Sequence, residues 1–260
     1  MRQFVGYLSK VGVYRLEQLI DIAIFAHGQK RAKAVAERIA VWNSDNSHRQ
    51  VKYAIAVGGM QFSGNPEILE LEANVVWNQF VNESGGSNNY YYLDGKPLLI
   101  NYSSYSQRST WTNANIDKSR TGHFNLQWAQ GTVPEVENNR QVPSPSEYGS
   151  YFGWAYPQGS LNNNNVMVVM PYWNNSLGGL VSQTENPMQG DFYKFKGWER
   201  VLSQKPKMVV INSFNEYYEK TAIAPTDTSR LPLYEQWKSP NLYWDITVDY
   251  NTRYKQMFST

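Results

Sequence analysis

The sequence of 260 residues contains no cysteine, which excludes disulfide bonds, thiolate metal ligands and a cysteine nucleophile. Histidine is scarce as well, and His27, His48 and His123 lack the spacing of a metal-binding motif. Neither a Gly-rich dinucleotide pattern nor a phosphate-binding loop ending in Gly-Lys-Ser/Thr is present. We therefore expect no metal and no organic cofactor.

Charged residues make up 18% of the chain, below the roughly 25% of a typical globular protein. The 24 basic and 22 acidic residues are spread without long runs, so the sequence does not predict the one-sided basic surface of a nucleic-acid-binding protein. No segment approaches the roughly 18 consecutive apolar residues of a membrane helix, and the N-terminus lacks the apolar core of a signal peptide. We expect no nucleic-acid or membrane partner. The compartment is unknown, and it would be periplasmic or extracellular if the N-terminus is truncated.

Aromatic residues, by contrast, are abundant: they reach 15% of the chain, with 19 Tyr and 9 Trp. Tyrosine and tryptophan rings bury a large area while keeping a hydrogen-bonding edge, which suits stacking on sugar rings. The same property suits ordinary cores and interfaces. Composition alone leaves both interpretations open.

Short apolar runs alternate with helical patterns along the chain. Residues 14–41 have apolar positions at helical spacing, which predicts one helix, or two helices separated at Gly28. Residues 65–81 predict a further helix with Pro66 in its first turn. Apolar runs that end in polar or aromatic residues predict six strands, at 51–59, 96–104, 123–131, 151–159, 166–173 and 207–216.

Strands that are separated by helices or long crossovers favour a parallel sheet with both faces covered. The expected fold class is α/β, and the expected architecture is a (β/α)8 TIM-type barrel that forms a single domain over residues 1–260. A complete barrel has eight strands in about 250 residues. Because residues 3–8 offer only a weak seventh candidate, the chain either disguises or lacks one or two of its first strands. Residues 1–50 would then be an atypical N-terminal helical part.

The chemistry of a parallel barrel lies at the carboxyl ends of its strands, so the residues there are candidates for substrate contacts. Aromatic rings and amides recur at these positions. The predicted substrate-binding residues are Tyr102, Trp128, Trp154, Tyr156, Trp173, Asn215 and Tyr217. Packing in the core or at the rim is the alternative for each ring taken singly. Repetition at several strand ends favours one cavity that binds a carbohydrate.

Glu216 and Glu219 follow the last predicted strand, in the stretch "VVINSFNEYYEK" that ends at Lys220. Residues three apart on a helical turn have Cβ atoms about 5 to 6 Å apart. Two carboxylates this close repel, which raises the pKa of one of them, so that one group can donate a proton while the other stays an anion. Glycosidic cleavage requires this division of labour, and a separation on the order of 5 Å goes with retention. The alternative is that Glu216 caps a loop and Glu219 is a solvated first-turn acid.

A longer stretch around the two glutamates resembles the W-N-E-W-x-E-G-T-x-I-x-P signature of the glycoside hydrolase family 99-like clan, which includes endo-α-mannosidases and endo-α-mannanases. Residues 90–102 and 190–202 also resemble segments of that family, so the resemblance covers roughly residues 50–255. The positions of the signature that match in place are Asn215, Glu216, Glu219, Thr221, Ile223 and Pro225.

The resemblance implies a (β/α)8 barrel that hydrolyses glycosidic bonds, with retention in the mannose-active members. It implies that Glu219 is the general acid/base and that Glu216 assists the substrate's own 2-hydroxyl as internal nucleophile. Phe214 and Tyr217 replace tryptophans of the signature and Lys220 replaces its glycine, so the shape of the subsites and the identity of the sugar do not transfer.

The expected function is therefore a glycoside hydrolase that acts on a polysaccharide or glycan, endo-acting and retaining. Two alternatives stay open. One is a non-catalytic barrel that binds carbohydrate through its aromatic cleft, and the other is an enzyme of polysaccharide assembly.

Overall fold

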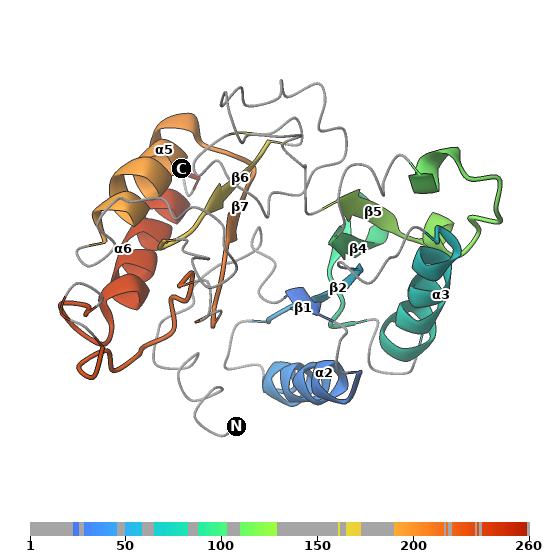
Figure 1. The fold of residues 1–260 in the computed structure, drawn as a ribbon, viewed down its shortest axis with the longest axis horizontal. Helices are drawn as coiled ribbons and strands as arrows, with labels where there is room; N and C mark the ends of the chain where they lie inside the picture. Colours follow the sequence, from blue (N-terminus) through green and yellow to red (C-terminus); the bar gives the residue numbers. More distant parts are fainter. Residues whose placement is uncertain are drawn as a thin grey trace. The chain divides into compact units, whose positions relative to one another are not determined.

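The computed structural model places the chain in two compact units, which belong to residues 1–155 and 156–260 (Figure 1). The structure describes residues 23–25, 29–45, 50–58, 65–82, 88–102, 110–128, 161, 165–172, 190–215, 217, 220–231, 233 and 236–258. Within these ranges no helix combines the length and the apolar character needed to cross a membrane. The single domain over residues 1–260 stays a prediction.

A parallel sheet forms the centre of the first unit. Strands β1 (Ala23–Phe25), β2 (Ala54–Gly58), β4 (Lys96–Tyr102) and β5 (Asn125–Trp128) are neighbours in that order, and each pairing is parallel. A two-residue strand, β3 (Tyr92–Leu93), pairs with the start of β4 in the antiparallel direction. Residues 54–57 and 98–100 are all buried. Near-continuous burial along a strand is typical of a parallel sheet with both faces covered.

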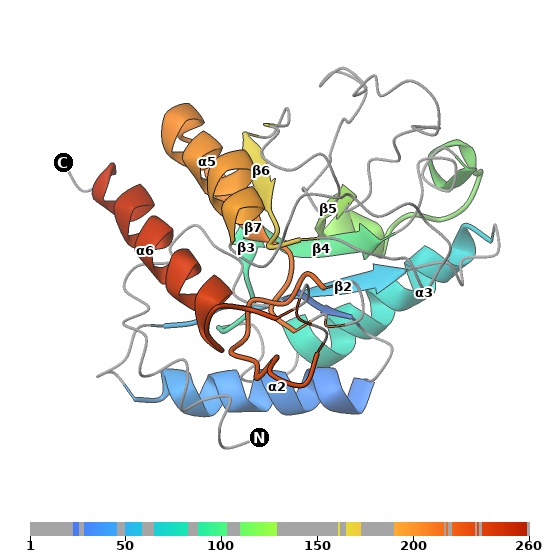
Figure 2. The same ribbon diagram turned by 60° about the vertical axis from the view of Figure 1, so that its left-hand side comes forward.

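Helices connect these parallel strands along the sequence. Helix α2 (Gln29–Asn43) lies between β1 and β2, and α3 (Glu67–Val76) follows β2 and continues into the π-helical segment η2 (Trp77–Val81). Helix α3 runs alongside β2 (Figure 2). Its buried side recurs at three- and four-residue spacing, which is the pattern of a helix that packs on a sheet. The buried apolar residues are Leu69, Ala73 and Val76 in α3, and Phe80 and Val81 in η2.

Tyr90 joins β2 to β4 through a buried hydroxyl group. The hydroxyl accepts a hydrogen bond from the backbone N–H of Ile55 at 3.1 Å and donates one to the carbonyl oxygen of Leu98 at 2.8 Å. Its ring lies against that of Tyr53, with the centroids 5.3 Å apart. A buried backbone group without a hydrogen-bond partner is costly. The Tyr90 hydroxyl therefore stabilises both strands, because it gives a partner to one backbone N–H of β2 and to one carbonyl oxygen of β4.

The second unit is built on two parallel strands, β6 (Val166–Val169) and β7 (Met208–Ile211). Between them in the sequence lie the π-helical segment η7 (Phe192–Trp198) and helix α5 (Glu199–Gln204), and helix α6 (Leu242–Gln256) follows. All of β6 is buried. Helix α6 packs against η7 and α5, and both views show the three helical segments side by side (Figures 1 and 2).

Four rings form an aromatic cluster between these helical segments: Tyr193, Trp198, Tyr243 and Tyr250. The ring of Trp198, which is fully buried, stacks on Tyr250 at a centroid distance of 6.0 Å and meets Tyr193 edge-on at 6.0 Å. The hydroxyls of Tyr193 and Thr247 are 2.8 Å apart and share a hydrogen bond. The aromatic abundance of the sequence thus supplies the core of this unit.

Buried tyrosines make the fold sensitive to alkaline pH. Burial raises the pKa of Tyr53 and of Tyr254 to about 12, from the ordinary value of 10.0, and burial also raises the pKa values of Tyr90, Tyr193 and Tyr243. The unfolded chain therefore loses these protons at lower pH than the folded chain does. This contribution to the free energy of unfolding is complete below about pH 10 and falls as the pH rises toward 12 and beyond.

We expect urea titrations between about pH 8 and about pH 11 to show this fall, with tyrosinate absorbance appearing together with unfolding. Complete tyrosine ionisation near pH 10 in a chain that keeps its native circular dichroism would contradict the expectation.

Five of the six predicted strands are confirmed, because β2, β4, β5, β6 and β7 each lie inside a predicted range. The sixth, 151–159, and the weak candidate at 3–8 lie outside the described residues. The helix predicted at 65–81 is confirmed by α3 and η2, and α2 confirms the helix that was expected to begin after Gly28.

Residues 23–25 were expected to be helical, and this expectation is wrong. They form β1, whose residues pair with Ala54 to Ala56 of β2. A pairing partner about thirty residues away decides the conformation of this segment, and helical spacing of apolar residues does not reveal such a partner. The N-terminal part is therefore not purely helical. The α/β class with parallel strands is confirmed, and closure into a (β/α)8 barrel stays a prediction.

Candidate functional site

Only part of the predicted site falls within the described residues. Glu216 and Glu219 lie outside them, and so do Trp154, Tyr156 and Trp173. The backbone of Tyr102 ends β4, while its side chain is not described. The described candidates are Trp128, Asn215 and Tyr217. In the loop that follows β7, the structure describes residues 212–215, 217 and 220–224.

This loop, residues 212–224, begins as a continuation of the β6–β7 pairing. The N–H of Asn212 donates to the carbonyl oxygen of Val169 at 2.9 Å. The next residue pairs across the loop: the N–H of Ser213 donates to the carbonyl oxygen of Thr221 at 3.0 Å, and the two side-chain oxygens are 2.9 Å apart and share a hydrogen bond. The base of the loop is therefore closed at Ser213, two residues beyond the end of β7.

The returning arm of the loop is buried. Thr221 is fully buried, and Ile223 donates its N–H to the carbonyl oxygen of Ser213 at 3.1 Å. Ala224 donates to the carbonyl oxygen of Phe214 at 2.9 Å. The ring of Phe214 meets Trp244 of α6 edge-on, with centroids 6.4 Å apart. Both arms are thus fixed to the body of the second unit.

At the tip of the loop, by contrast, two described residues face solvent. Asn215 is exposed, and Tyr217 is 51% exposed. Two backbone hydrogen bonds shape the tip: Tyr217 N–H donates to Asn215 at 3.1 Å, and Lys220 N–H donates to Tyr217 at 3.2 Å. An exposed amide and an exposed aromatic ring on a fixed backbone suit hydrogen bonding and stacking on a sugar. The sequence places Glu216 and Glu219 on either side of Tyr217 in this tip.

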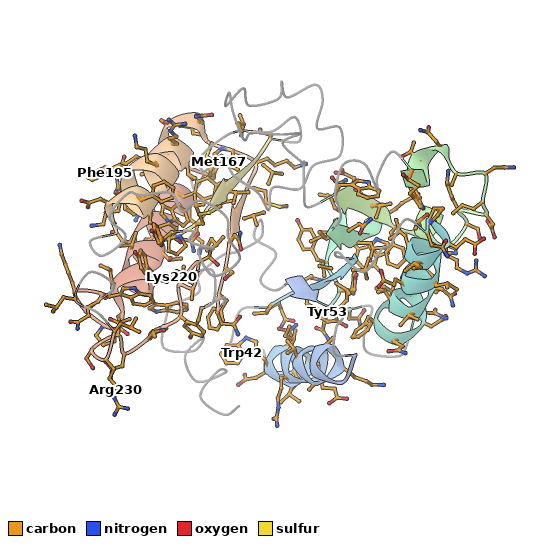
Figure 3. All side chains as sticks on the ribbon, in the orientation of Figure 1. Trp42, Tyr53, Met167, Phe195, Lys220 and Arg230 are labelled. Atoms are coloured by element: carbon orange, nitrogen blue, oxygen red, sulfur yellow. The ribbon has the colours of Figure 1, made fainter. Side chains whose placement is uncertain are left out.

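Lys220 stands in the left-handed region, with φ of 59° (labelled in Figure 3). This position is the one where the signature has glycine, and glycine adopts positive φ without steric cost. We expect Lys220→Gly to raise the free energy of unfolding by about 1 kcal/mol, measured by urea denaturation. Lys207→Gly is the matched control: Lys207 is absent from the positive-φ residues of the described chain, so glycine should destabilise there. A loss of stability in Lys220→Gly would contradict the backbone argument.

Trp128, at the end of β5, is buried and contacts another tryptophan. Its ring centroid is 5.9 Å from that of Trp111, whose indole N–H donates to Oε1 of Glu70 at 3.3 Å. Glu70, on α3, is 3% exposed and also accepts hydrogen bonds from Thr121, at 2.6 Å from the hydroxyl and 3.1 Å from the N–H. The sequence analysis did not identify Glu70, because local spacing gives no sign of a hydrogen-bond partner 51 residues away.

The sequence matches no protein-family profile, and it matches no curated protein. Two solved structures of the GH99 endo-alpha-mannosidase from Bacteroides thetaiotaomicron are similar to this chain, each at 14% sequence identity. One has a TM-score of 0.57 and covers 92% of this chain and 76% of that chain. The other, in complex with BIS-TRIS-Propane, has a TM-score of 0.63 and covers 100% of this chain and 85% of that chain. The chain therefore has a GH99-like fold.

Proposed function

We propose that this chain, whose fold is GH99-like, is an endo-acting, retaining glycoside hydrolase of a polysaccharide or glycan, with its strands closed into a (β/α)8 barrel. One observation carries the proposal: a loop that is closed at its base directly after β7 holds the Asn-Glu-x-x-Glu sequence of the glycosidase signature, in a chain of this fold. Neither the loop sequence nor the fold would suffice alone, because one fold hosts many chemistries.

In this mechanism Glu219 is the general acid/base. It donates its proton to the glycosidic oxygen as the bond to the anomeric carbon breaks, and Glu216 accepts the proton of the substrate's 2-hydroxyl as that oxygen attacks the same carbon. Water then attacks the anomeric carbon and opens the resulting ring: Glu219 takes the proton of that water, and Glu216 returns its proton to the 2-oxygen, which restores the 2-hydroxyl and both side chains. Two inversions at the anomeric carbon give net retention, and no covalent bond to the enzyme forms.

The proposed substrate contacts are Tyr102, Trp128, Trp154, Tyr156, Trp173, Asn215 and Tyr217. The exposed ring of Tyr217 and the exposed amide of Asn215 support two of these assignments. The described ring contact of Trp128 is with Trp111, so its assignment as a substrate contact rests on the sequence. The proposed partner of the chain is therefore a carbohydrate.

A hydrolysis assay on a panel of α-mannans and mannose-containing glycans tests the proposal. We expect new reducing ends, oligosaccharide products from internal cleavage, and a first-formed product anomer that matches the substrate when followed by NMR. Binding without release of reducing ends would instead indicate a carbohydrate-binding barrel. Transfer of sugar to a growing chain would indicate polysaccharide assembly.

A further inference from the structure

We propose that the side-chain hydroxyls of Ser213 and Thr221 form a positioning pair at the base of the loop tip, residues 214–220, and that this pair supports the segment in which the sequence places Glu216 and Glu219. The two oxygens are 2.9 Å apart across the base of the loop. This inference rests on the proposed function of the two glutamates, since it assigns to the pair the task of fixing the distance between them.

The pair lies close in the sequence to both glutamates, one member on each side of them. Ser213 precedes Glu216 by three residues, and Thr221 follows Glu219 by two. The backbone bonds between the same two residues and from Ile223 to Ser213 set the register of the two arms. The hydroxyl bond adds a side-chain contact between the arms. Restricting both ends of a short loop removes most of the ways in which its tip can move.

Burial distinguishes a positioning role from a catalytic one. Thr221 is fully buried, so a substrate does not reach its hydroxyl, whereas Tyr217 at the tip is 51% exposed. The pair therefore acts through the backbone that carries the glutamates. Misplacing a catalytic group by about 1 Å can cost on the order of 100-fold in rate, so a modest loosening of the base is measurable in kcat.

Four single variants and one double variant test the pair. Ser213→Ala and Thr221→Val each remove one hydroxyl and leave the backbone bonds possible, and valine keeps the shape of threonine. Thr221→Ser keeps the hydroxyl. Thr226→Val is the matched control, because the Thr226 hydroxyl donates to the carbonyl oxygen of Ala224 at 2.8 Å, outside the pair. The double variant Ser213→Ala/Thr221→Val tests whether the two side chains act as one unit.

The first measurement is amide hydrogen exchange of the peptides that cover residues 212–224, which needs no substrate. We expect exchange about tenfold faster in Ser213→Ala and in Thr221→Val, no further increase in the double variant, and wild-type rates in Thr221→Ser and Thr226→Val. The second is kinetics on a hydrolysed glycan, where kcat should fall about tenfold in the two hydroxyl-deleting variants while KM stays within about twofold.

Unchanged exchange in Ser213→Ala and Thr221→Val, or an additive double variant, would overturn the positioning pair. Faster amide exchange in these variants together with a wild-type kcat would contradict the proposal that the pair positions Glu216 and Glu219. A chain that hydrolyses no glycan yet shows the exchange pattern would refute the proposed function and support the pair as the element that holds the loop. The two failures are therefore distinguishable.

Discussion

Glu219→Gln is expected to hydrolyse a glycan substrate about 10³-fold more slowly than the wild-type chain, with binding nearly unchanged. Glutamine keeps the shape of the side chain but has no proton to transfer, so a sugar leaving group would depart without protonation. An aryl glycoside with an acidic phenol needs little protonation, and its loss should shrink to about tenfold. Glu216→Gln should slow both substrates to a similar extent, because activation of the 2-hydroxyl is needed whatever the leaving group.

Initial rates on both substrates, with affinities from calorimetry, check this expectation. Glu67→Gln supplies the matched control, since Glu67 is an exposed acid at the start of α3 and should keep wild-type rates. Wild-type turnover by folded Glu219→Gln would remove the catalytic assignment of Glu219. An equal loss on the two leaving groups would give Glu219 a role other than that of an acid.

Trp198→Ala is expected to lower the free energy of unfolding by about 3 to 5 kcal/mol, the largest stability effect that we predict for the second unit. The Trp198 ring is fully buried and contacts Tyr193 and Tyr250, so alanine leaves a large cavity between η7, α5 and α6. It also removes two aromatic contacts, each of which is worth about 0.5 to 1.5 kcal/mol beyond burial. Urea denaturation followed by circular dichroism measures the change.

Phe195→Ala is the matched control on the same helical segment. Phe195 is 60% exposed (labelled in Figure 3), so its removal should change the free energy of unfolding by no more than about 0.5 kcal/mol. Comparable losses in the two variants would mean that the aromatic cluster is not the core of the second unit. If Trp198→Ala is too unstable to purify, Trp198→Phe replaces it in the comparison. We expect Trp198→Phe to lower the free energy of unfolding by a smaller amount.

Sequence patterns predicted five of the described strands, and β6 is the clearest case. Residues 166–169 are all buried, and the apolar run of residues 166–170, bounded by Asn165 and Pro171, is sufficient to predict such a strand. Strand β1 escaped prediction because its conformation depends on β2, a partner that lies far away in the sequence. Local spacing carries no information about a partner of this kind.

Strand β3 was missed although a local signal was present. Asp94 and Gly95 both have positive φ, at 50° and 80°, and Leu93 pairs with Lys96 across them. An Asp-Gly pair between two short extended segments is the strongest short-range sign of a hairpin, because both residues adopt this region at low cost. The sequence analysis predicted one strand at residues 96–104 and no hairpin before it, so β3 was missed.

At the candidate site, the sequence predicted which residues follow β7 but not how the loop is fixed. Ser213 and Thr221 are eight positions apart, and a hydrogen bond between two hydroxyls at that separation has no periodic signal. Thr221 was identified as a position that matches the signature, but its hydrogen bond to Ser213 was not predicted. The buried carboxylate of Glu70 is a second case, because its partner Thr121 lies 51 residues away.

The 212–224 loop contains both buried residues, which lie on its returning arm, and exposed residues, which lie at its tip. Thr221 and Ile223, which keep the signature, are buried, whereas Tyr217 and Lys220, which depart from it, belong to the tip. Substitutions at the exposed positions Asn215 and Tyr217 are therefore expected to leave the buried returning arm undisturbed. Under the proposed function, a laboratory library restricted to Asn215 and Tyr217, the exposed described positions of the tip, would vary sugar recognition while the buried returning arm stays constant.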